Sequence, residues 1–194
     1  MQNKKGLILA ALALVVLIGG ASVLYNQLSS GQAPDNLAVQ GDQSSQSQQE
    51  DTSQQPEPVP DITVLDWEGN EATLWEMRGK PVILNFWASW CGPCKSEMPA
   101  FEDAYQTYGD QIHFMMVNLT DGDRETVELA QRFIEDQGYT FPVYFDTTLE
   151  AGITYGASAI PITFFIDAEG YGVAYAQSAL SRETLQTGID MLLS

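Results

Sequence analysis

The uneven distribution of apolar residues along this chain limits which part of it can fold as a globular domain. Residues 6–25 are almost wholly apolar, residues 26–60 are almost wholly polar, and residues 61–194 mix both kinds. The mixed stretch is long enough to bury one hydrophobic core, whereas the polar stretch cannot bury enough apolar surface to fold. We therefore predict an N-terminal apolar segment in residues 1–25, a flexible linker in residues 26–60 and one folded domain in residues 61–194.

The apolar segment has the length of a membrane-spanning helix. About 20 apolar residues, at a helical rise of about 1.5 Å per residue, span a hydrocarbon core of about 30 Å. Lys4 and Lys5 precede the segment and favour a cytoplasmic N-terminus, which places the rest of the chain outside the cytoplasm. Gly19 and Ala21 also fit cleavage of a secretory signal peptide after Ala21. We expect a single-pass membrane anchor with an extracytoplasmic domain, and secretion after cleavage is the alternative.

The predicted domain is strongly acidic. It has 6 Lys and Arg against 21 Asp and Glu, which is a net charge of −15 out of −18 for the whole chain. Such a surface is repelled by nucleic-acid phosphates and by anionic lipid headgroups. We therefore expect no nucleic-acid partner, and we expect contact with the membrane only through the N-terminal segment. We also expect the domain to be monomeric.

Apolar periodicity and turn residues predict an α/β domain. Strands are expected at residues 62–65, 71–73, 82–87, 112–119, 141–145, 162–166 and 172–176. Helices are expected at residues 91–108, 124–137, 149–155 and 182–193. We expect Asp121 or Asp123 to cap the second helix and Gly138 to end it, and Ser181 to cap the last helix. Strands that alternate with helices and end in a hairpin and a helix predict a mixed sheet.

The two cysteines of the chain, Cys91 and Cys94, lie where a predicted core strand leads into a helix. A zinc site needs about four Cys or His ligands, and the chain has a single histidine besides this pair. A structural disulfide gains stability by closing a long loop, and two intervening residues close almost none. A redox-active pair is therefore the favoured interpretation.

A helix N-terminus has a physical effect on a cysteine placed there. Its unpaired backbone N–H groups and the positive end of the helix dipole stabilise a thiolate at Cys91. The thiolate is the form that attacks a disulfide. Cys94, one helical turn further on, can resolve the mixed disulfide that results. Pro93 is tolerated in the first turn because its missing N–H would have no partner there.

The segment FWASWCGPCKSEMPAF, from Phe86 to Phe101, resembles the active-site segment of thioredoxin-like proteins. It is most similar to the TlpA/ResA group, which are membrane-anchored, extracytoplasmic thiol–disulfide oxidoreductases. The resemblance covers residues 60–194. It implies a thioredoxin-like fold, in which helices flank a mixed central sheet, with an N-terminal strand pair and a strand–helix insertion between about residues 112 and 145.

The resemblance also implies further site residues. The matching proline of that fold is cis and lies against the cysteine pair, so Pro161 is expected there, with backbone groups of Ile160 lining the substrate groove. Glu97 matches a glutamate of the TlpA/ResA group and would be a buried proton acceptor near Cys94; a solvated surface glutamate is the alternative. Asn85 replaces the buried aspartate of cytoplasmic thioredoxins, and an amide cannot accept that proton. The groove would be completed by Trp90, Gly92 and Pro93.

The activity implied by the resemblance is the reduction of protein disulfides, because a Gly-Pro spacer resembles that of reducing thioredoxins. No cofactor is expected beyond the Cys91–Cys94 disulfide. The implied partners are a membrane electron donor, such as a CcdA/DsbD-like thiol carrier, and substrates such as apocytochrome c or methionine sulfoxide reductases. The alternatives are an oxidase that forms disulfides in secreted proteins, a non-catalytic thioredoxin-like binding module and, more weakly supported, a peroxidase.

Overall fold

The computed structural model describes residues 38–39 and 57–194 of the chain. The predicted anchor and nearly all of the predicted linker lie outside these residues. Two residues that we assigned to the linker form the short strand β1 (Ala38–Val39), which pairs antiparallel with β8 (Gly172–Ala176). Pairing there is possible because β8 would otherwise be an edge strand with free backbone groups. Among the described residues, no helix is long and apolar enough to cross a membrane.

The described strands form one mixed sheet of eight strands, in the order β1-β8-β7-β4-β5-β6-β2-β3. The remaining bounds are β2 Thr63–Leu65, β3 Glu71–Thr73, β4 Val82–Trp87, β5 His113–Leu119, β6 Val143–Asp146 and β7 Ile162–Ile166. The central strands β4, β5 and β6 are parallel, whereas β2, β3, β7 and β8 are paired antiparallel with their neighbours. The mixed sheet that the sequence pattern predicted is therefore confirmed.

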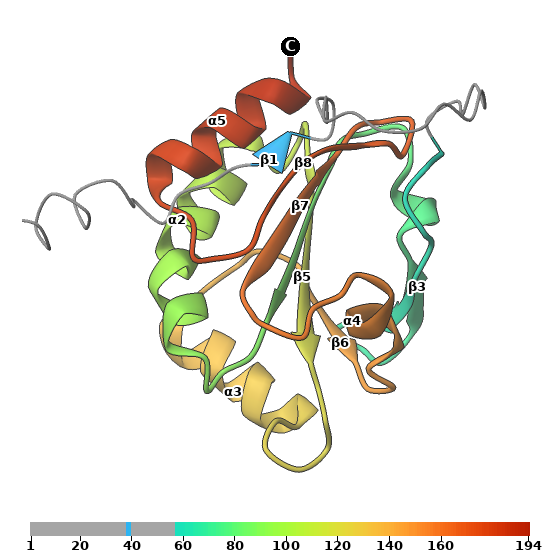
Figure 1. The fold of residues 1–194 in the computed structure, drawn as a ribbon. Coiled ribbons are helices and arrows are strands. Elements are labelled where there is room, and N and C mark those ends of the chain that lie inside the picture. Colours follow the sequence, from blue (N-terminus) through green and yellow to red (C-terminus); the bar gives the residue numbers. More distant parts are fainter. Residues whose placement is uncertain (1–37, 40–56) are drawn as a thin grey trace, which may run out of the picture. The chain divides into compact units, whose positions relative to one another are not determined.

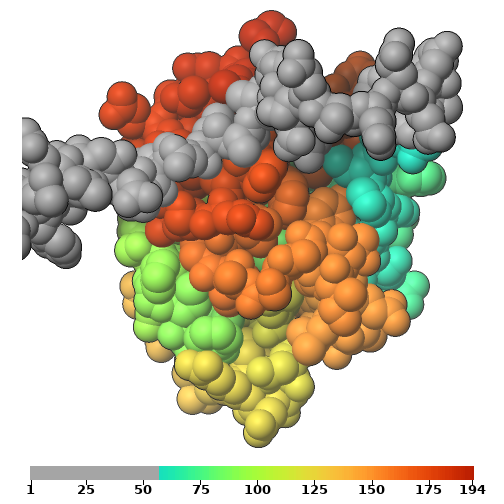
Figure 2. Space-filling model, viewed as in Figure 1, coloured from blue at the N-terminus to red at the C-terminus, as the bar shows by residue number. Residues whose placement is uncertain are grey.

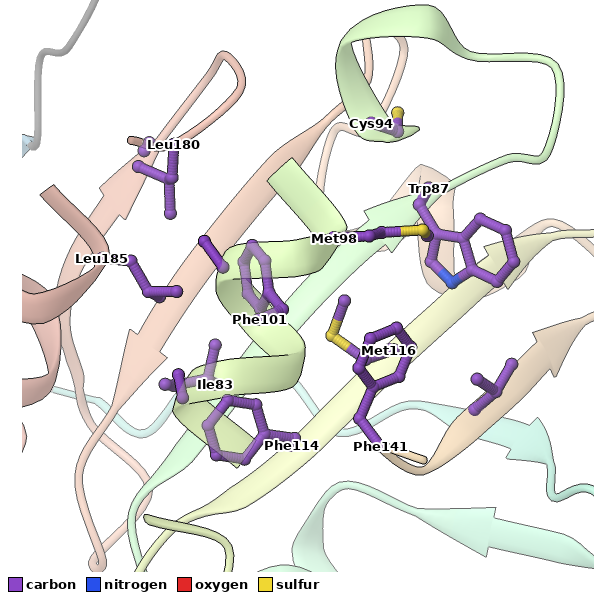
Figure 3. Packing of buried hydrophobic residues seen from close by; sticks show 14 of the residues in the cluster. Ile83, Trp87, Cys94, Met98, Phe101, Phe114, Met116, Phe141, Leu180 and Leu185 are labelled. Carbon is purple, nitrogen blue, oxygen red and sulfur yellow. The ribbon is translucent and has the colours of Figure 1, made fainter. Parts of the chain in front are cut away.

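Helices cover both faces of this sheet (Figure 1). Their bounds are α2 Gly92–Tyr108, α3 Val127–Gln137, α4 Glu150–Thr154, α5 Arg182–Leu192 and the 3₁₀ helix η1 Trp75–Met77. Helices α2, α3 and α5 pack on one face, whereas α4 and η1 pack on the other. Figure 3 shows the first of these cores, in which Met98 and Phe101 of α2 pack among aromatic and aliphatic side chains of the sheet.

Strand β4 is buried on both faces, and its residues alternate between the two cores. Ile83 and Trp87 point to the core beneath α2, whereas Leu84 and Phe86 point to the core beneath α4. Because successive side chains of a strand point to opposite faces, Asn85 lies on the same face as Ile83 and Trp87. Asn85 is therefore directed toward α2.

The start of α3 differs from the prediction. The helix begins at Val127 and its N-cap is Thr126, whose hydroxyl accepts the backbone N–H of Leu129. We expected a start at residue 124 with Asp121 or Asp123 as cap. Instead, the Asp121 carboxylate accepts the backbone N–H groups of Asp123 and Glu125, which closes a loop before the helix.

The other helix ends agree with the prediction to within one or two residues, which is the usual uncertainty of helix ends. Gly138 ends α3 in the left-handed conformation, with φ of 71°. Ser181 caps α5 by accepting the N–H of Thr184. Strand β6 begins two residues later than expected, at Val143, and β5 begins one residue later, at His113.

Candidate active site

Cys91 and Cys94 form a disulfide at the point where β4 leads into α2. Their Cα atoms are 5.3 Å apart. Cys91 is the N-cap residue of α2, and its Sγ accepts the backbone N–H of Cys94 at 3.1 Å. The Cys91 side chain is 4% exposed, whereas Cys94 is fully buried. A substrate can therefore reach Cys91 but not Cys94.

The loop before β7 brings a second segment to the disulfide. The Ile160–Pro161 peptide bond is cis, as the resemblance implied. The Ile160 carbonyl oxygen lies 3.7 Å from Cys91 Sγ, although 69 residues separate the two in sequence. Antiparallel pairing of β4 with β7 produces this proximity, because it places the start of β7 beside the end of β4.

Glu97 is buried beneath the disulfide on the same helix. Its side chain is 2% exposed, so the solvated alternative for this residue is wrong. One carboxylate oxygen accepts the Nδ2–H of Asn85 at 2.9 Å, and the other accepts the backbone N–H of Leu180 at 2.7 Å. Burial raises the pKa of Glu97 to about 7, against the opposing effect of these two hydrogen bonds.

Asn85 connects Glu97 to the sheet. Its Nδ2 also donates to the Thr163 hydroxyl at 2.9 Å, while its buried Oδ1 has no hydrogen-bond partner. In the sequence, Asn85 was visible as a single amide within the apolar strand β4. We interpreted it only as a replacement for the aspartate of cytoplasmic thioredoxins and did not predict its bond to Glu97. No sequence signal pointed to Leu180, whose N–H reaches Glu97 from a residue 83 positions away.

The loop between β5 and α3 forms another wall of the site, which the sequence analysis missed. Arg124 lies over the indole ring of Trp90, with 3.7 Å from its guanidinium carbon to the ring centroid. The Glu125 side chain is fully buried and accepts hydrogen bonds from the backbone and hydroxyl of Ser89 and from Nδ2 of Asn118. Through Ser89, Glu125 holds the turn that carries Trp90 and Cys91.

Comparisons with known proteins agree with this geometry. The AhpC/TSA family profile matches residues 56–173. Thiol-disulfide oxidoreductase ResA of Geobacillus thermodenitrificans is 33% identical over 135 residues, which cover 69% of this chain and 75% of that protein. The chain belongs to this family, as a thiol–disulfide oxidoreductase of the ResA type. The resemblance of the Phe86–Phe101 segment to thioredoxin-like thiol–disulfide oxidoreductases of the ResA type is thus confirmed.

Solved structures confirm the thioredoxin-like fold of this oxidoreductase. StoA from Bacillus subtilis superposes with a TM-score of 0.59 at 27% identity, covering 67% of this chain and 96% of that structure. A DsbF homologue from Corynebacterium diphtheriae superposes with a TM-score of 0.63 at 27% identity, covering 71% of this chain and 87% of that structure. The N-terminal strand pair, β2 and β3, and the insertion that contains β5, α3 and β6 are both present.

The remaining residues around the oxidoreductase site lie on its surface or away from it. Gly92 and Pro93 are exposed in the first turn of α2, where they separate Cys91 from Cys94. Lys95 is exposed on the same helix. His113 pairs with Val82 at the start of β4, and the disulfide follows the opposite end of that strand. The predicted site residues therefore lie around the disulfide, with Trp90, Gly92 and Pro93 on its solvent side, Glu97 buried on the same helix, and Ile160 and Pro161 in the loop before β7.

Proposed function

We propose that this oxidoreductase reduces disulfides of polypeptides outside the cytoplasm. The observation that carries the proposal is the environment of Cys91 Sγ, which faces one N–H donor and one carbonyl oxygen. The Cys94 N–H stabilises a thiolate, whereas the Ile160 carbonyl stabilises the protonated thiol by accepting its hydrogen. A strong oxidant needs a highly stabilised thiolate. The balance at Cys91 instead favours the low potential of a reductase.

In the proposed reaction, the Cys91 thiolate attacks one sulfur of the substrate disulfide. A bond between Cys91 Sγ and that sulfur forms, and the other substrate sulfur leaves as a thiolate that takes a proton from water. Cys94 then loses its proton and attacks Cys91 Sγ. The Cys91–Cys94 disulfide forms, and the second substrate sulfur leaves as a thiol. The substrate gains two electrons from the cysteine pair and two protons, one of which comes from water and the other from Cys94.

Glu97 is proposed as the group that accepts the proton of Cys94. Residues three apart on a helix are neighbours, with Cβ atoms about 5–6 Å apart. Because the pKa of Glu97 is about 7, the carboxylate is available near neutral pH and binds a proton almost as well as it releases one. Replacement of Glu97 by Gln should therefore slow resolution of the mixed disulfide far more than the initial attack by Cys91.

Each turnover leaves the protein oxidised, so an electron donor must reduce it again. Outside the cytoplasm we propose a membrane dithiol carrier of the CcdA/DsbD kind, which would form a mixed disulfide with Cys91 and leave both cysteines reduced. The predicted N-terminal anchor supports this proposal because it would keep the domain near such a carrier. Apocytochrome c and methionine sulfoxide reductases are the proposed substrates, on the basis of the resemblance to the TlpA/ResA group.

The reduction potential of the Cys91–Cys94 pair tests the direction of the reaction. The full chain is equilibrated with thiol–disulfide buffers, and tryptophan fluorescence reports the redox state because Trp90 adjoins Cys91. We expect a potential near that of thioredoxin, about −270 mV, or lower. A potential near about −120 mV would contradict the proposal and indicate a disulfide-forming oxidase.

A further inference from the structure

A cavity of about 370 Å³ opens beside α4, on the face of the sheet opposite α2. The side chains of Leu119, Leu149, Ile153 and Ala157 line it, and none of its described lining residues is charged. Figure 2 shows α4 and the segment that follows it, in orange, at the surface next to the yellow loop after β5. Neither the disulfide chemistry nor Glu97 makes use of this cavity.

The cavity adjoins the place where a substrate disulfide must approach. Ser158, on its rim, is two residues before Ile160, whose carbonyl oxygen lies 3.7 Å from Cys91 Sγ. Two residues span at most about 7 Å of chain. On the opposite wall, Leu119 directly follows Asn118, which pairs with Trp87 at the end of β4. A polypeptide bonded to Cys91 therefore has residues within reach of the cavity.

One residue in the lining of the cavity, Leu149, has a backbone conformation that is unfavourable for a residue with a side chain. Leu149 has φ of 62°, and it is the single non-glycine residue with positive φ in the described part of the chain. Such conformations persist where the surrounding structure enforces them, and they are frequent at binding sites. Next to it, Gly152 allows α4 to lie against β5, because a Cβ at this position would be 2.8 Å from Leu119 Cδ2.

The chemistry of the lining selects the occupant. Ile153 is 77% exposed, which is the largest exposed fraction among the exposed large hydrophobic residues of the described chain. An apolar side chain that covered Ile153 and filled the cavity would remove apolar surface from water. An anionic ligand finds no basic group in the lining and is repelled by a domain of net charge −15.

We propose that the α4 cavity, lined by Leu119, Leu149, Ile153 and Ala157, holds an apolar side chain of the substrate polypeptide. This side chain lies within a few residues of the cysteine that becomes bonded to Cys91. The proposal rests on the proposed exchange with polypeptide disulfides, but not on the direction of that exchange. The cavity thus determines which disulfides react fastest, while the cysteine pair performs the chemistry.

The test compares two synthetic peptides of equal length and charge, each with one internal disulfide. One peptide carries Leu and Phe two and three residues from the reactive cysteine, and the other carries Ser at both positions. Their second-order rate constants with the reduced full chain are measured by stopped-flow tryptophan fluorescence. We expect the apolar peptide to react about tenfold faster. The ratio of the two constants is the readout because any change in the cysteines affects both peptides equally.

Two substitutions on the rim are expected to bring the ratio close to one. Ile153→Glu places a charge beside the cavity, and Ser158→Trp fills its opening. Both positions are exposed, so the fold tolerates the changes. The matched control is Leu129→Glu on α3, an exposed leucine outside the cavity lining that receives the same charge. This control should keep the tenfold ratio.

A ratio near one in the unsubstituted protein would overturn the proposal, as would a tenfold ratio that survives both rim substitutions. The same ratio is then measured in the opposite direction, with the oxidised full chain and the dithiol forms of the peptides. If the protein proves to be an oxidase, the proposed direction fails, while a preference for the apolar peptide in this second measurement still supports the cavity. If the apolar peptide is not preferred in either direction, the proposed role of the cavity is refuted, while the proposed function of the cysteine pair is unaffected.

Discussion

Glu97 lies between the side chain of Asn85 and the backbone of Leu180, and its carboxyl group has almost no access to water. Burial favours the neutral acid, whereas both hydrogen bonds favour the carboxylate. The result is a pKa of about 7, well above the usual value of 4.5. The charge beneath the disulfide therefore changes over the pH range in which thiols also begin to ionise.

This pKa predicts how stability depends on pH. Folded Glu97 keeps its proton up to about pH 7, while in the unfolded chain it loses the proton near pH 4.5. Between these two pH values the folded state holds one proton more than the unfolded chain. The stability contributed by neutral Glu97 is therefore fully present below pH 4.5 and is lost as pH rises through 7. The rise in the pKa of Glu97 from 4.5 to about 7 corresponds to a loss of roughly 3 kcal/mol in the free energy of unfolding.

Urea unfolding of the oxidised protein and of its Glu97→Gln variant, between pH 4 and 8.5, measures this loss. The free energy of unfolding of the unsubstituted protein should fall relative to the variant as the pH rises. The difference between the two proteins isolates Glu97 because the other titrating groups are common to both. A difference that is constant across this range would show that Glu97 has an ordinary pKa.

Asn85 provides a second prediction at this scale. Its Nδ2–H lowers the pKa of Glu97, so Asn85→Leu, which has similar volume and no donor, should raise that pKa further above about 7. Carbon-13 NMR of labelled glutamate carboxyl groups measures the value. The control is Thr163→Val, which removes the other partner of Asn85 but leaves the bond to Glu97. Equal titration curves for Asn85→Leu and the control would contradict this role.

Among the helices and strands, α3 is the element whose start is decided by tertiary contacts and not by local capping preference. Any of Asp121, Asp123 and Thr126 can cap a helix, and their spacing alone does not choose between them. The choice follows from Glu125, whose side chain is drawn inward to Ser89 and Asn118. Asp121 stabilises the resulting loop, and the helix can begin only after it, at Val127.

Replacing the observed cap should therefore cost more than replacing the predicted one. Thr126→Ala removes the acceptor of the Leu129 N–H and should lower the free energy of unfolding by about 1 kcal/mol. Asp123→Ala should change it by less than about 0.5 kcal/mol, as expected for an exposed residue that caps nothing. Chemical denaturation of both variants provides the comparison, and a larger effect at Asp123 would place the helix start where the sequence pattern suggested.

For the whole molecule, the dominant property is its negative charge of −18. Charges of this size act beyond direct contacts and change encounter rates with charged partners, and added salt screens the effect. The rate constant for a disulfide peptide of charge +3 should fall severalfold between 10 and 200 mM NaCl. The constant for a peptide of charge −3 should rise over the same range. The rate constants are measured by stopped-flow fluorescence, with a neutral peptide as control. The same salt dependence for all three peptides would refute an electrostatic effect of the protein's charge on the encounter rate.

Much of the fold and part of the site follow from short-range rules, and these were predictable. The strand before Cys91, the helix after it and the caps at Ser181 and Gly138 depend on neighbours within about four residues. The proposed roles of Cys91 as nucleophile and Cys94 as resolving cysteine rest on their spacing of one helical turn. Pro161 and Glu97 could be assigned only through resemblance to a known family, because nothing near them in sequence marks their roles.

The remaining features depend on residues that are far apart in sequence. Leu180 reaches Glu97 across 83 residues, Ile160 reaches Cys91 across 69, and Arg124 covers Trp90. The cavity beside α4 also combines the end of β5 with a helix some 30 residues later. Local preferences carry no information about such contacts, since they arise when the order of strands in the sheet brings separate loops to one edge. The placement of the cysteine pair is thus determined by local sequence, whereas the surroundings of Glu97 and the cavity proposed to bind substrate are formed by the packing of the sheet.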